Sequence, residues 1–324
     1  MRYIIYGAGG IGCTIGARLF QHGRDVLLIA RGAHLEAIRK SGLDFRSPDE
    51  KTNLSIPCVG HPSEIDFGDQ DVVLLTMKSQ HTIPALLDLR QAAGDQVPVF
   101  CCQNGVANER EALRRFERVY GMVVVVPATF LVPGTVRTEA KGVTGILDAG
   151  RYPAGIDATA ETVTSDLADS SFSSLPDPHI MKMKYAKLLW NLNNAAYVLC
   201  GPEDTERMRS ITQMLRREAQ DCYRAAGIEW TDDEAYGARK SNSVQMVKVD
   251  GEEHRPSAWQ SVARQTGSIE ADFFNGEIVL LGRMHGVRTP ANHLLQRLAN
   301  RLVSQKEEPG SWSLERIMGM IDRA

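Results

Sequence analysis

The sequence lacks the features that mark a disulfide-stabilised, zinc-binding or membrane-spanning protein. Six cysteines are spread over 324 residues without a C-x-x-C pair, so we expect no disulfide scaffold and reduced core thiols. The eight histidines form no H-E-x-x-H motif and no cluster with cysteine, so we expect no metal site. The longest nearly continuous apolar stretch, Met122–Pro133, contains two prolines and is too short to cross a bilayer.

The sequence also has little net charge. Lys and Arg total 37 against 40 for Asp and Glu, which gives a net charge of −3. We therefore expect neither nucleic acid nor an anionic membrane as a partner. The amino terminus runs from Met1 to Gly7 directly into further glycines, without the long apolar core of a secretory signal, so we expect a cytoplasmic protein.

The first half of the chain alternates short apolar runs with segments of helical periodicity, which predicts an α/β fold with a parallel sheet. The predicted strands are Arg2–Tyr6, Asp25–Ala30, Asp71–Met77, Val97–Cys102 and Val119–Val126, and the predicted helices are Ile11–His22, His34–Lys40, Thr82–Arg90, Asn108–Phe116 and Ala160–Ala168. Glycines that follow Pro133 suggest a hairpin-like extension of this part.

The second half is almost wholly helical in pattern. Its predicted helices are Met181–Leu199, Glu203–Ala226, Ser257–Gln265, Glu270–His285 and Ala291–Ser304. Asp169–His179 is rich in Ser and Pro and is typical of a domain boundary. We therefore predict a doubly wound α/β domain over residues 1–178 and an all-helical domain over 179–324.

A glycine-rich motif follows the first predicted strand. Gly7-Ala8-Gly9-Gly10-Ile11-Gly12 fits G-x-G-x-x-G and opens the first helix, as in the Rossmann dinucleotide-binding fingerprint. Gly7 permits the tight turn, Gly9 leaves room for a pyrophosphate, and Gly12 lets the helix pack closely on the strand. The alternative is a glycine-rich turn without a ligand, but the strand and helix around the motif favour a dinucleotide.

The second predicted strand indicates which dinucleotide. NAD sites usually place an acid at the end of this strand, whereas here the strand ends in Ala30-Arg31. A guanidinium can pair with a 2′-phosphate, so we expect NADP(H) rather than NAD(H). Lys78 follows the third strand at the same sheet edge and could add positive charge there. The alternative for both side chains is a solvated surface position.

The helix predicted over 181–199 carries a polar stripe. On one continuous helix Asn191 lies about 40° from Lys187 and Asn194 lies about 20° from it on the other side. Apolar residues occupy most of the other positions of this helix. A partly buried lysine beside asparagines suits a proton donor that faces a ligand, because burial lowers a lysine pKa. The alternative is a solvated polar face.

These motifs together resemble the ketopantoate reductase family, the NADPH-dependent reductases of pantothenate biosynthesis, over nearly the whole chain. The matching segments are Gly7–Gly12, Arg31, Lys78, Gln103–Val106, Pro133–Val136, Lys187–Asn191, Pro256-Ser257, Glu270–Gly276, Gly286-Val287 and Thr289-Pro290. The resemblance implies a helical domain like the C-terminal domain of 6-phosphogluconate dehydrogenase, with substrate bound between the two domains.

The resemblance also implies roles for individual residues. Lys187 corresponds to the catalytic lysine that protonates the carbonyl oxygen, and Glu270 to a glutamate that positions cofactor ribose and substrate and interacts with the lysine. The implied cofactor contacts are Gly7, Gly9, Gly10, Ile11, Gly12, Arg31, Lys78, Asn104, Ala128 and Glu270. The implied substrate contacts are Asn104, Lys187, Asn191, Asn194 and Ser257. From the residues alone, Asn104-Gly105 is equally a turn, Ser257 a helix cap and Glu270 a first-turn acid.

The sequence departs from the family pattern at positions expected to touch substrate. Ala195 replaces a second asparagine, Ser261 replaces an acid, and Tyr185 stands where a tryptophan is usual. The expected function is NADPH-dependent reduction of a small 2-oxo acid, with 2-dehydropantoate (ketopantoate) as the leading substrate. The alternatives are a paralogous reductase or dehydrogenase for another carbonyl compound, and a non-catalytic NADP(H) sensor. The oligomeric state is left open, with a homodimer as one alternative.

Overall fold

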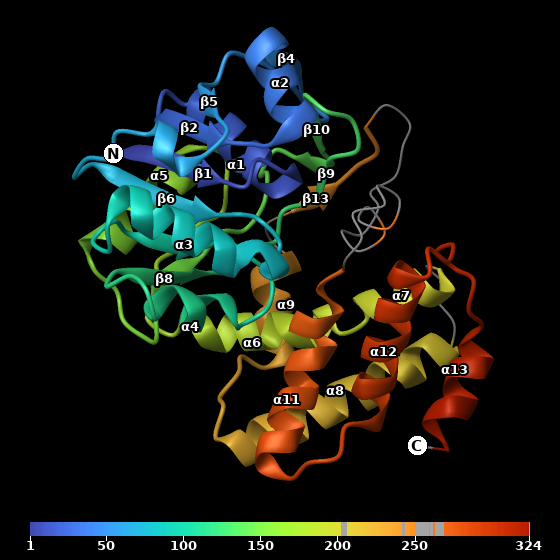
Figure 1. Ribbon diagram of the computed structural model, residues 1–324. Coiled ribbons are helices and arrows are strands. Elements are labelled where there is room, and N and C mark those ends of the chain that lie inside the picture. The colour runs from blue at the N-terminus through green and yellow to red at the C-terminus, as the bar shows by residue number, and fades with distance from the viewer. Residues whose placement is uncertain (202–205, 242–243, 250–258, 260–261, 263–268, 324) are drawn as a thin grey trace. The chain divides into compact units, whose positions relative to one another are not determined.

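The computed structural model describes residues 1–201, 206–241, 244–249, 259, 262 and 269–323. The chain forms two compact units, one made of Met1–Lys184 with Asp232–His254 and the other of Tyr185–Thr231 with Arg255–Ala324. The predicted border at residues 178 and 179 lies six residues before the change of unit, and the return of 232–254 to the first unit was not predicted. Figure 1 shows the elements of both units.

A seven-stranded sheet forms the centre of the first unit, in the order β12-β8-β7-β6-β1-β2-β5. Its strands are β1 (Arg2–Tyr6), β2 (Asp25–Ile29), β5 (Cys58–Val59), β6 (Asp71–Leu75), β7 (Val99–Cys101), β8 (Val119–Met122) and β12 (Ala149–Arg151). All neighbours pair in parallel except β12, which runs antiparallel to β8. The chain winds outward from β1 through β2 and then returns to β6, so the two halves of the sheet meet between β1 and β6.

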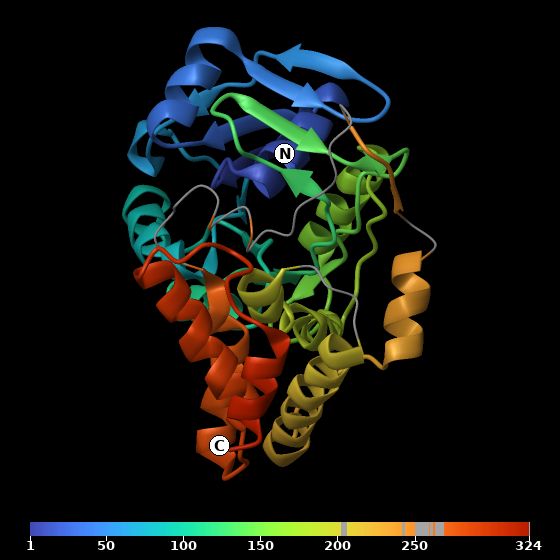
Figure 2. The same ribbon diagram turned by 90° about the vertical axis from the view of Figure 1, so that its right-hand side faces the viewer.

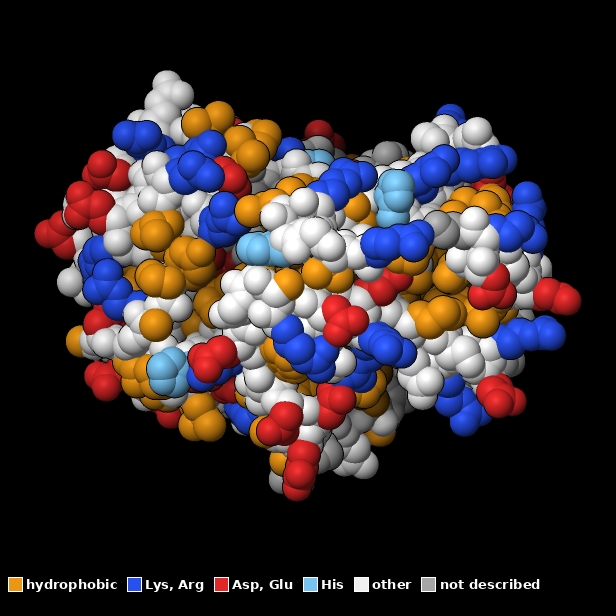
Figure 3. Space-filling view, turned by 90° about the horizontal axis from the view of Figure 1, so that it is seen from below, with side chains coloured by type: hydrophobic (Ala, Val, Ile, Leu, Met, Phe, Trp, Pro, Cys, Tyr) orange, Lys and Arg blue, Asp and Glu red, His pale blue; other side chains and the backbone are white. Residues whose placement is uncertain are grey.

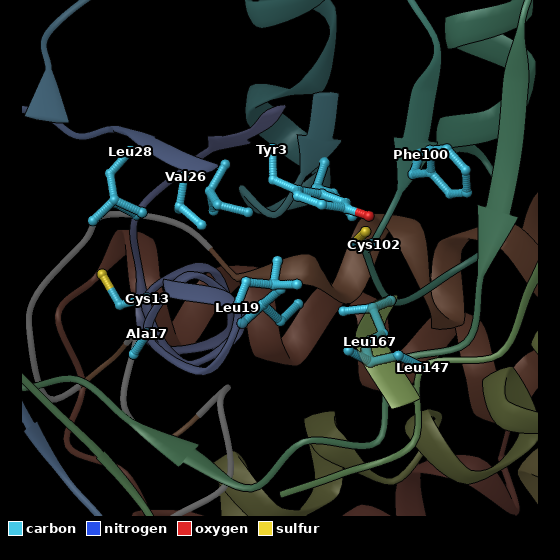
Figure 4. Close-up of a cluster of buried hydrophobic side chains, with 14 of the residues drawn as sticks. Tyr3, Cys13, Ala17, Leu19, Val26, Leu28, Phe100, Cys102, Leu147 and Leu167 are labelled. Carbon is cyan, nitrogen blue, oxygen red and sulfur yellow. The ribbon is translucent and has the colours of Figure 1, made fainter. Parts of the chain in front are cut away.

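Helices cover both faces of this sheet, as expected for strands that are apolar on both sides. One face packs against α1 (Gly10–Gln21), α2 (Gly32–Ser41) and α5 (Ala158–Asp169), and the other against α3 (Thr82–Ala93) and α4 (Asn108–Leu113). Figure 4 shows strand side chains such as Tyr3 and Leu28 opposite Cys13 and Leu19 of α1. The predicted strands and helices of this part are all present, with ends that differ by a few residues.

A second sheet of the first unit was not predicted as such. Its order is β4-β3-β10-β9, built from β3 (Leu43–Arg46), β4 (Lys51–Leu54), β9 (Ala128–Thr129) and β10 (Thr135–Thr138). β3 and β10 are parallel, so segments about ninety residues apart lie side by side, as the blue and green strands in Figure 2 show. The hairpin-like extension predicted after Pro133 is therefore part of a sheet that also includes the β3–β4 hairpin.

The Ser- and Pro-rich segment 169–179 is not a free linker within the first unit. Its backbone is hydrogen-bonded along residues 144–149. The first of these bonds runs from Thr144 N to Ser171 O at 2.7 Å, and the last runs from Asp177 N to Ala149 O at 2.9 Å. Gly150 is required here, because a β-carbon at this position would lie 1.9 Å from the Asp177 carbonyl oxygen. Proline and serine are compatible with this extended backbone, and composition alone does not distinguish it from a linker.

Residues 232–254 return to the first unit through α9 (Asp233–Ser241) and β13 (Gln245–Met246), neither of which was predicted. β13 pairs with β11 (Ala140–Lys141). Arg239 of α9 donates to both carboxylate oxygens of Asp148, at 2.8 and 2.6 Å, and to Ser173 Oγ at 2.8 Å. These long-range contacts assign the segment to the first unit, and local periodicity carries no sign of them.

The second unit is helical in the part that the structure describes. It contains the carboxyl half of α6 (Ile180–Asn191), α7 (Asn194–Cys200), α8 (Glu206–Ala226), the 3-10 helix η3 (Glu270–Phe273), α11 (Asn275–His285), α12 (Pro290–Ser304) and α13 (Leu314–Ile321). Two of the long helices predicted here are divided in the structure, 181–199 into α6 and α7 and 270–285 into η3 and α11. No helix among the described residues is both long and apolar enough to span a membrane.

Candidate cofactor and catalytic site

The glycine loop between β1 and α1 has the geometry that its sequence predicts. Gly7 has a φ of +110°, and a β-carbon there would lie 2.6 Å from Met77 N. A β-carbon at Gly12 would lie 2.5 Å from both the Gly7 carbonyl oxygen and Thr76 Oγ1. A β-carbon at Gly9 would have no neighbour among the described residues nearer than the Gly7 carbonyl oxygen at 3.9 Å. The loop is therefore tight behind Gly7 and Gly12 and open in front of Gly9, as a phosphate-binding loop requires.

The predicted cofactor residues of the first unit gather at one edge of the sheet. Asn104 follows β7, Lys78 follows β6, Gly7 follows β1 and Arg31 follows β2, and these four strands are adjacent in that order. Because the strands are parallel, all four residues lie at their carboxyl ends. In doubly wound folds ligands bind at this edge, where the winding direction reverses. Arg31 is exposed and Lys78 is half-buried.

Ala128 lies beside the glycine loop. A β-carbon at Gly10 would be 3.5 Å from Ala128 Cβ and 3.6 Å from its carbonyl carbon and oxygen. Ala128 begins β9, which pairs with β10 in the small sheet. The small sheet therefore delimits the space around the start of α1. The structure thus brings Ala128 next to Gly10 although the residues are far apart in sequence.

A buried polar network joins the turns after β6 and β7. Gln103 Nε2 donates to Met77 O at 2.9 Å and to Thr82 Oγ1 at 2.8 Å. Asn108 Nδ2 donates to Ser79 Oγ and to Asn104 O, both at 3.2 Å. The network fixes the backbone of Asn104, while its carboxamide oxygen is buried without a hydrogen-bond partner among the described residues. An unsatisfied buried acceptor is costly and is consistent with a ligand that donates to it.

Behind this turn lies a buried ion pair that the sequence analysis did not assign. Lys184 Nζ lies 2.6 Å from Glu109 Oε1, and the two side chains are 2% and 0% exposed. The ammonium also donates to Gln103 O at 2.8 Å and to Met122 O at 3.2 Å. A lysine among the apolar residues of the predicted 181–199 helix was the available signal, but its partner is 75 residues earlier in the chain.

In the second unit Lys187 and Asn191 both lie on α6, one helical turn apart, and both are half-buried. Asn191 Nδ2 is buried without a hydrogen-bond partner among the described residues. The polar stripe was predicted on the assumption that 181–199 is one continuous helix. This assumption is wrong, because α6 ends at Asn191 and Asn194 begins α7. The role suggested for Asn194 as a substrate ligand stays a prediction.

The break between α6 and α7 has identifiable hydrogen bonds. The carbonyl of Leu192 accepts from Asn275 Nδ2 at 3.2 Å, and Asn193 Nδ2 donates to Thr212 Oγ1 at 2.8 Å. Asn275 thus supplies a side-chain donor to one backbone carbonyl at this position. Asn275 belongs to the Glu270–Gly276 motif but carries no predicted role, so the sequence contained this residue without indicating its function.

Glu270 begins η3 and is 8% exposed, and its carbonyl accepts from Phe274 N at 3.1 Å. It lies in the first turn of a 3-10 helix rather than of the long helix predicted over 270–285. Ser257 lies outside the described residues, so its predicted role is not addressed by the structure. Among the described residues no three His, Cys, Asp or Glu side chains form a metal-binding group.

Charges of both signs lie interspersed with apolar side chains on the face shown in Figure 3, which agrees with the net charge of −3. At the start of the glycine loop, burial raises the pKa of Tyr6 to about 12, with a further increase from Asp88 and an opposing effect of Arg31. Burial also raises the pKa values of Cys13, Cys101 and Cys102, so these core thiols are neutral near pH 7.

Residues 3–150 match the family model of ketopantoate reductase PanE/ApbA, and residues 179–303 match the model of its C-terminal part. A 2-dehydropantoate 2-reductase of Pyrococcus abyssi is 30% identical over 301 residues, covering 91% of this chain and 95% of that protein.

Solved structures give the same fold. The crystal structure of a PanE/ApbA family ketopantoate reductase from Ralstonia eutropha JMP134 is 25% identical and covers 95% of this chain and 100% of its own, with a TM-score of 0.78. D-mandelate dehydrogenase in a ternary structure with NADH and anilino(oxo)acetate is 23% identical over 95% of this chain and 100% of its own, with a TM-score of 0.82. The latter similarity is one of fold.

Proposed function

Since this chain belongs to the ketopantoate reductase family, we propose that it reduces a small 2-oxo acid with NADPH, and that 2-dehydropantoate is its leading substrate. One observation carries the proposal: Gly7, Arg31, Lys78 and Asn104 follow four adjacent parallel strands and lie at one edge of the sheet. That edge is where a doubly wound sheet binds a dinucleotide.

The residues at this edge fit a dinucleotide with a 2′-phosphate. The open space in front of Gly9 and the free N–H groups at the start of α1 suit the pyrophosphate. Strand β2 leads into Arg31 without an acid that would bind a ribose 2′-hydroxyl, and the guanidinium is suited to a phosphate. These features support NADPH over the NADH contained in the D-mandelate dehydrogenase structure.

The proposed chemistry divides between the cofactor and the side chains of the second unit. When bound, the reduced nicotinamide supplies the hydride for the carbonyl carbon. Lys187 donates a proton to the carbonyl oxygen, and its positive charge stabilises the negative charge that develops there. The carboxamide of Asn191 has a buried Nδ2 group without a described partner, which can donate to a substrate oxygen.

A steady-state assay that follows NADPH oxidation with 2-dehydropantoate and a panel of other 2-oxo acids tests the proposal. We expect Lys187→Ala to lower kcat by about 10²- to 10⁴-fold, the usual contribution of a general acid. Lys182→Ala is the matched control, because Lys182 lies on a different face of α6 and should retain activity. Full turnover in Lys187→Ala would show that another group donates the proton.

A second candidate is a dehydrogenase or reductase for a different 2-oxo acid. Ala195 and Ser261 depart from the family pattern at expected substrate positions, and the fold is shared with D-mandelate dehydrogenase. Activity with the 2-oxo acid of mandelate, and none with 2-dehydropantoate, would favour this candidate. NADPH binding without turnover on any carbonyl compound would instead favour a non-catalytic sensor.

A further inference from the structure

The buried pair of Lys184 and Glu109 lies directly behind the turn that carries Asn104. Besides Glu109, the Lys184 ammonium contacts three backbone carbonyl oxygens, those of Gln103 at 2.8 Å, Met122 at 3.2 Å and Cys101 at 3.4 Å. Cys101 ends β7 and Met122 ends β8. One side chain therefore binds the carboxyl ends of two adjacent strands and the peptide that leads into Asn104.

Stability alone does not explain this arrangement. Burying two charges carries a large desolvation cost that their mutual attraction only roughly offsets, so apolar replacements of such pairs are often neutral or stabilising. An ammonium among carbonyl oxygens does, however, fix the directions in which those carbonyls point. The pair is therefore better suited to specifying the backbone than to increasing the free energy of unfolding.

The ion pair of Lys184 and Glu109 restrains the backbone of Asn104. The Gln103 carbonyl belongs to the peptide group whose nitrogen is that of Asn104, and Lys184 Nζ holds this carbonyl at 2.8 Å. On the other side, the Asn104 carbonyl accepts from Asn108 Nδ2 at 3.2 Å. Asn108 precedes Glu109 in α4, so Glu109 positions the lysine while its neighbour holds the next carbonyl. Both peptide groups that flank the Asn104 side chain are thus restrained.

We propose that Lys184 and Glu109 are positioning residues for the reductase reaction, which hold the Asn104 carboxamide in its productive orientation. This inference rests on the proposed function and on the role that the family resemblance implies for Asn104, a contact with both cofactor and substrate. Neither Lys184 nor Glu109 touches the substrate in this proposal, and both act through the Gln103–Asn104 peptide. Misplacement of a catalytic-site group by about 1 Å can lower the rate about 10²-fold.

The test uses the double variant Lys184→Met/Glu109→Gln in the full chain. A single replacement would leave one buried charge without a partner and could prevent folding, whereas the double variant removes both charges with side chains of similar volume. The matched control is Arg2→Met/Asp71→Asn. This change removes an ion pair of 2.6 Å at the opposite, amino edge of the same sheet.

We expect the double variant to fold, with kcat lowered between about ten- and a hundredfold and the KM for NADPH changed by less than about threefold. Amide hydrogen exchange of residues 103–109 should become about tenfold faster or more, because the restraint on that backbone is lost. The control should retain both kcat and the slow exchange of this segment. A merely structural pair would lower the melting temperature and leave kcat unchanged.

The two proposals fail in different ways. In a protein that reduces a 2-oxo acid, a double variant with wild-type kcat overturns the positioning role and leaves the proposed function intact. If the wild-type protein reduces no 2-oxo acid, the proposed function is wrong. Amide hydrogen exchange alone then tests whether the pair restrains the backbone of Asn104. Unchanged exchange of residues 103–109 in the double variant then overturns the positioning role as well.

Discussion

Asn275 Nδ2 donates a hydrogen bond to the carbonyl oxygen of Leu192 at 3.2 Å, at the break that separates Asn191 from Asn194. The same carboxamide donates to Asn292 Oδ1 at 3.0 Å, and Asn292 Nδ2 in turn donates to Leu215 O at 3.1 Å. Asn275 and Asn292 are both almost fully buried. The end of α6 is therefore tied to α11, α12 and α8 by a chain of side-chain amides.

The first prediction concerns Asn275. Asn275→Ala removes the donor to Leu192 and leaves buried acceptors unpaired, which should lower the free energy of unfolding by about 1–3 kcal/mol. Because the end of α6 carries Asn191, the KM for the 2-oxo acid should increase, while the NADPH Kd should change little, since all expected cofactor contacts except Glu270 lie in the first unit. Urea unfolding, steady-state kinetics and NADPH fluorescence titration measure the three quantities.

Asn300→Ala provides the control for Asn275. Asn300 Nδ2 makes an exposed hydrogen bond to Asp272 Oδ1 at 2.7 Å, and its loss should cost little stability and leave KM unchanged. An Asn275→Ala protein that is destabilised but has a wild-type KM would show that the amide chain stabilises the unit without orienting Asn191.

The second prediction concerns cofactor preference. If Arg31 binds the 2′-phosphate, Arg31→Ala should weaken NADPH binding by about 1.5–3 kcal/mol, or roughly ten- to a hundredfold, and leave NADH binding nearly unchanged. Arg39→Ala on α2, the helix that follows Arg31, is the control, because Arg39 pairs with Glu64 at 2.9 Å on the exposed surface. Equal weakening of both cofactors in Arg31→Ala would assign the preference to another side chain, with Lys78 the next to replace.

The third prediction separates the two reasons for glycine in the loop. A β-carbon at Gly12 would overlap the Gly7 carbonyl and Thr76, so Gly12→Ala should lower stability by about 1–3 kcal/mol. Gly9 has a φ of −94° and open space before it, so Gly9→Ala should fold normally and bind NADPH more weakly. Thermal unfolding and NADPH titration of both variants test this. A Gly9→Ala protein with wild-type affinity would mean that no phosphate approaches this residue.

The fold was predictable where local sequence determines it. The β1–Gly7–α1 unit follows from a buried apolar run, a glycine motif and a helical period, and the structure has it within a residue or two. The 169–179 segment was predicted as a domain boundary, but its backbone pairing with residues 144–149 was not predicted, because a segment rich in Ser and Pro carries no strand pattern. The return of α9 to the first unit depends on Arg239 and Asp148, which are 91 residues apart, and no periodicity encodes such a contact.

The site was predictable to the extent that its residues carry motifs. The glycine loop, Arg31, Lys78 and Asn104 were named from the sequence, and the order of the strands brings them to one edge. The ion pair of Lys184 and Glu109 was not predicted, because ion pairs between distant segments depend on tertiary structure. The stripe of Lys187, Asn191 and Asn194 assumed an unbroken helix, whereas the Asn275 bond to Leu192 is one of the contacts that define the break.

The last prediction concerns alkaline pH. Burial raises the pKa values of Tyr6 and Tyr236 to about 12, above the value near 10 expected in the unfolded chain. A folded-state pKa that is raised contributes stability in full below pH 10, and this contribution is lost as the pH increases towards 12. The buried thiols of Cys13, Cys101 and Cys102, whose pKa values are also raised, act in the same direction from about pH 8.5. The free energy of unfolding measured with urea should therefore decrease from about pH 8.5 and more steeply above pH 10, by at most about 1.4 kcal/mol per pH unit for each tyrosine.

Tyr236→Phe tests the assignment, because Phe keeps the buried ring and removes the ionisable hydroxyl. Its urea midpoint should decrease less steeply between pH 10 and 12 than that of the wild-type protein, since the unfolded variant has one tyrosine fewer to ionise. Tyr236 lies on α9, so this variant also reports on the segment that returns to the first unit. If the two pH profiles were parallel, Tyr236 would ionise equally well in the folded protein. In that case burial would not raise the pKa of Tyr236.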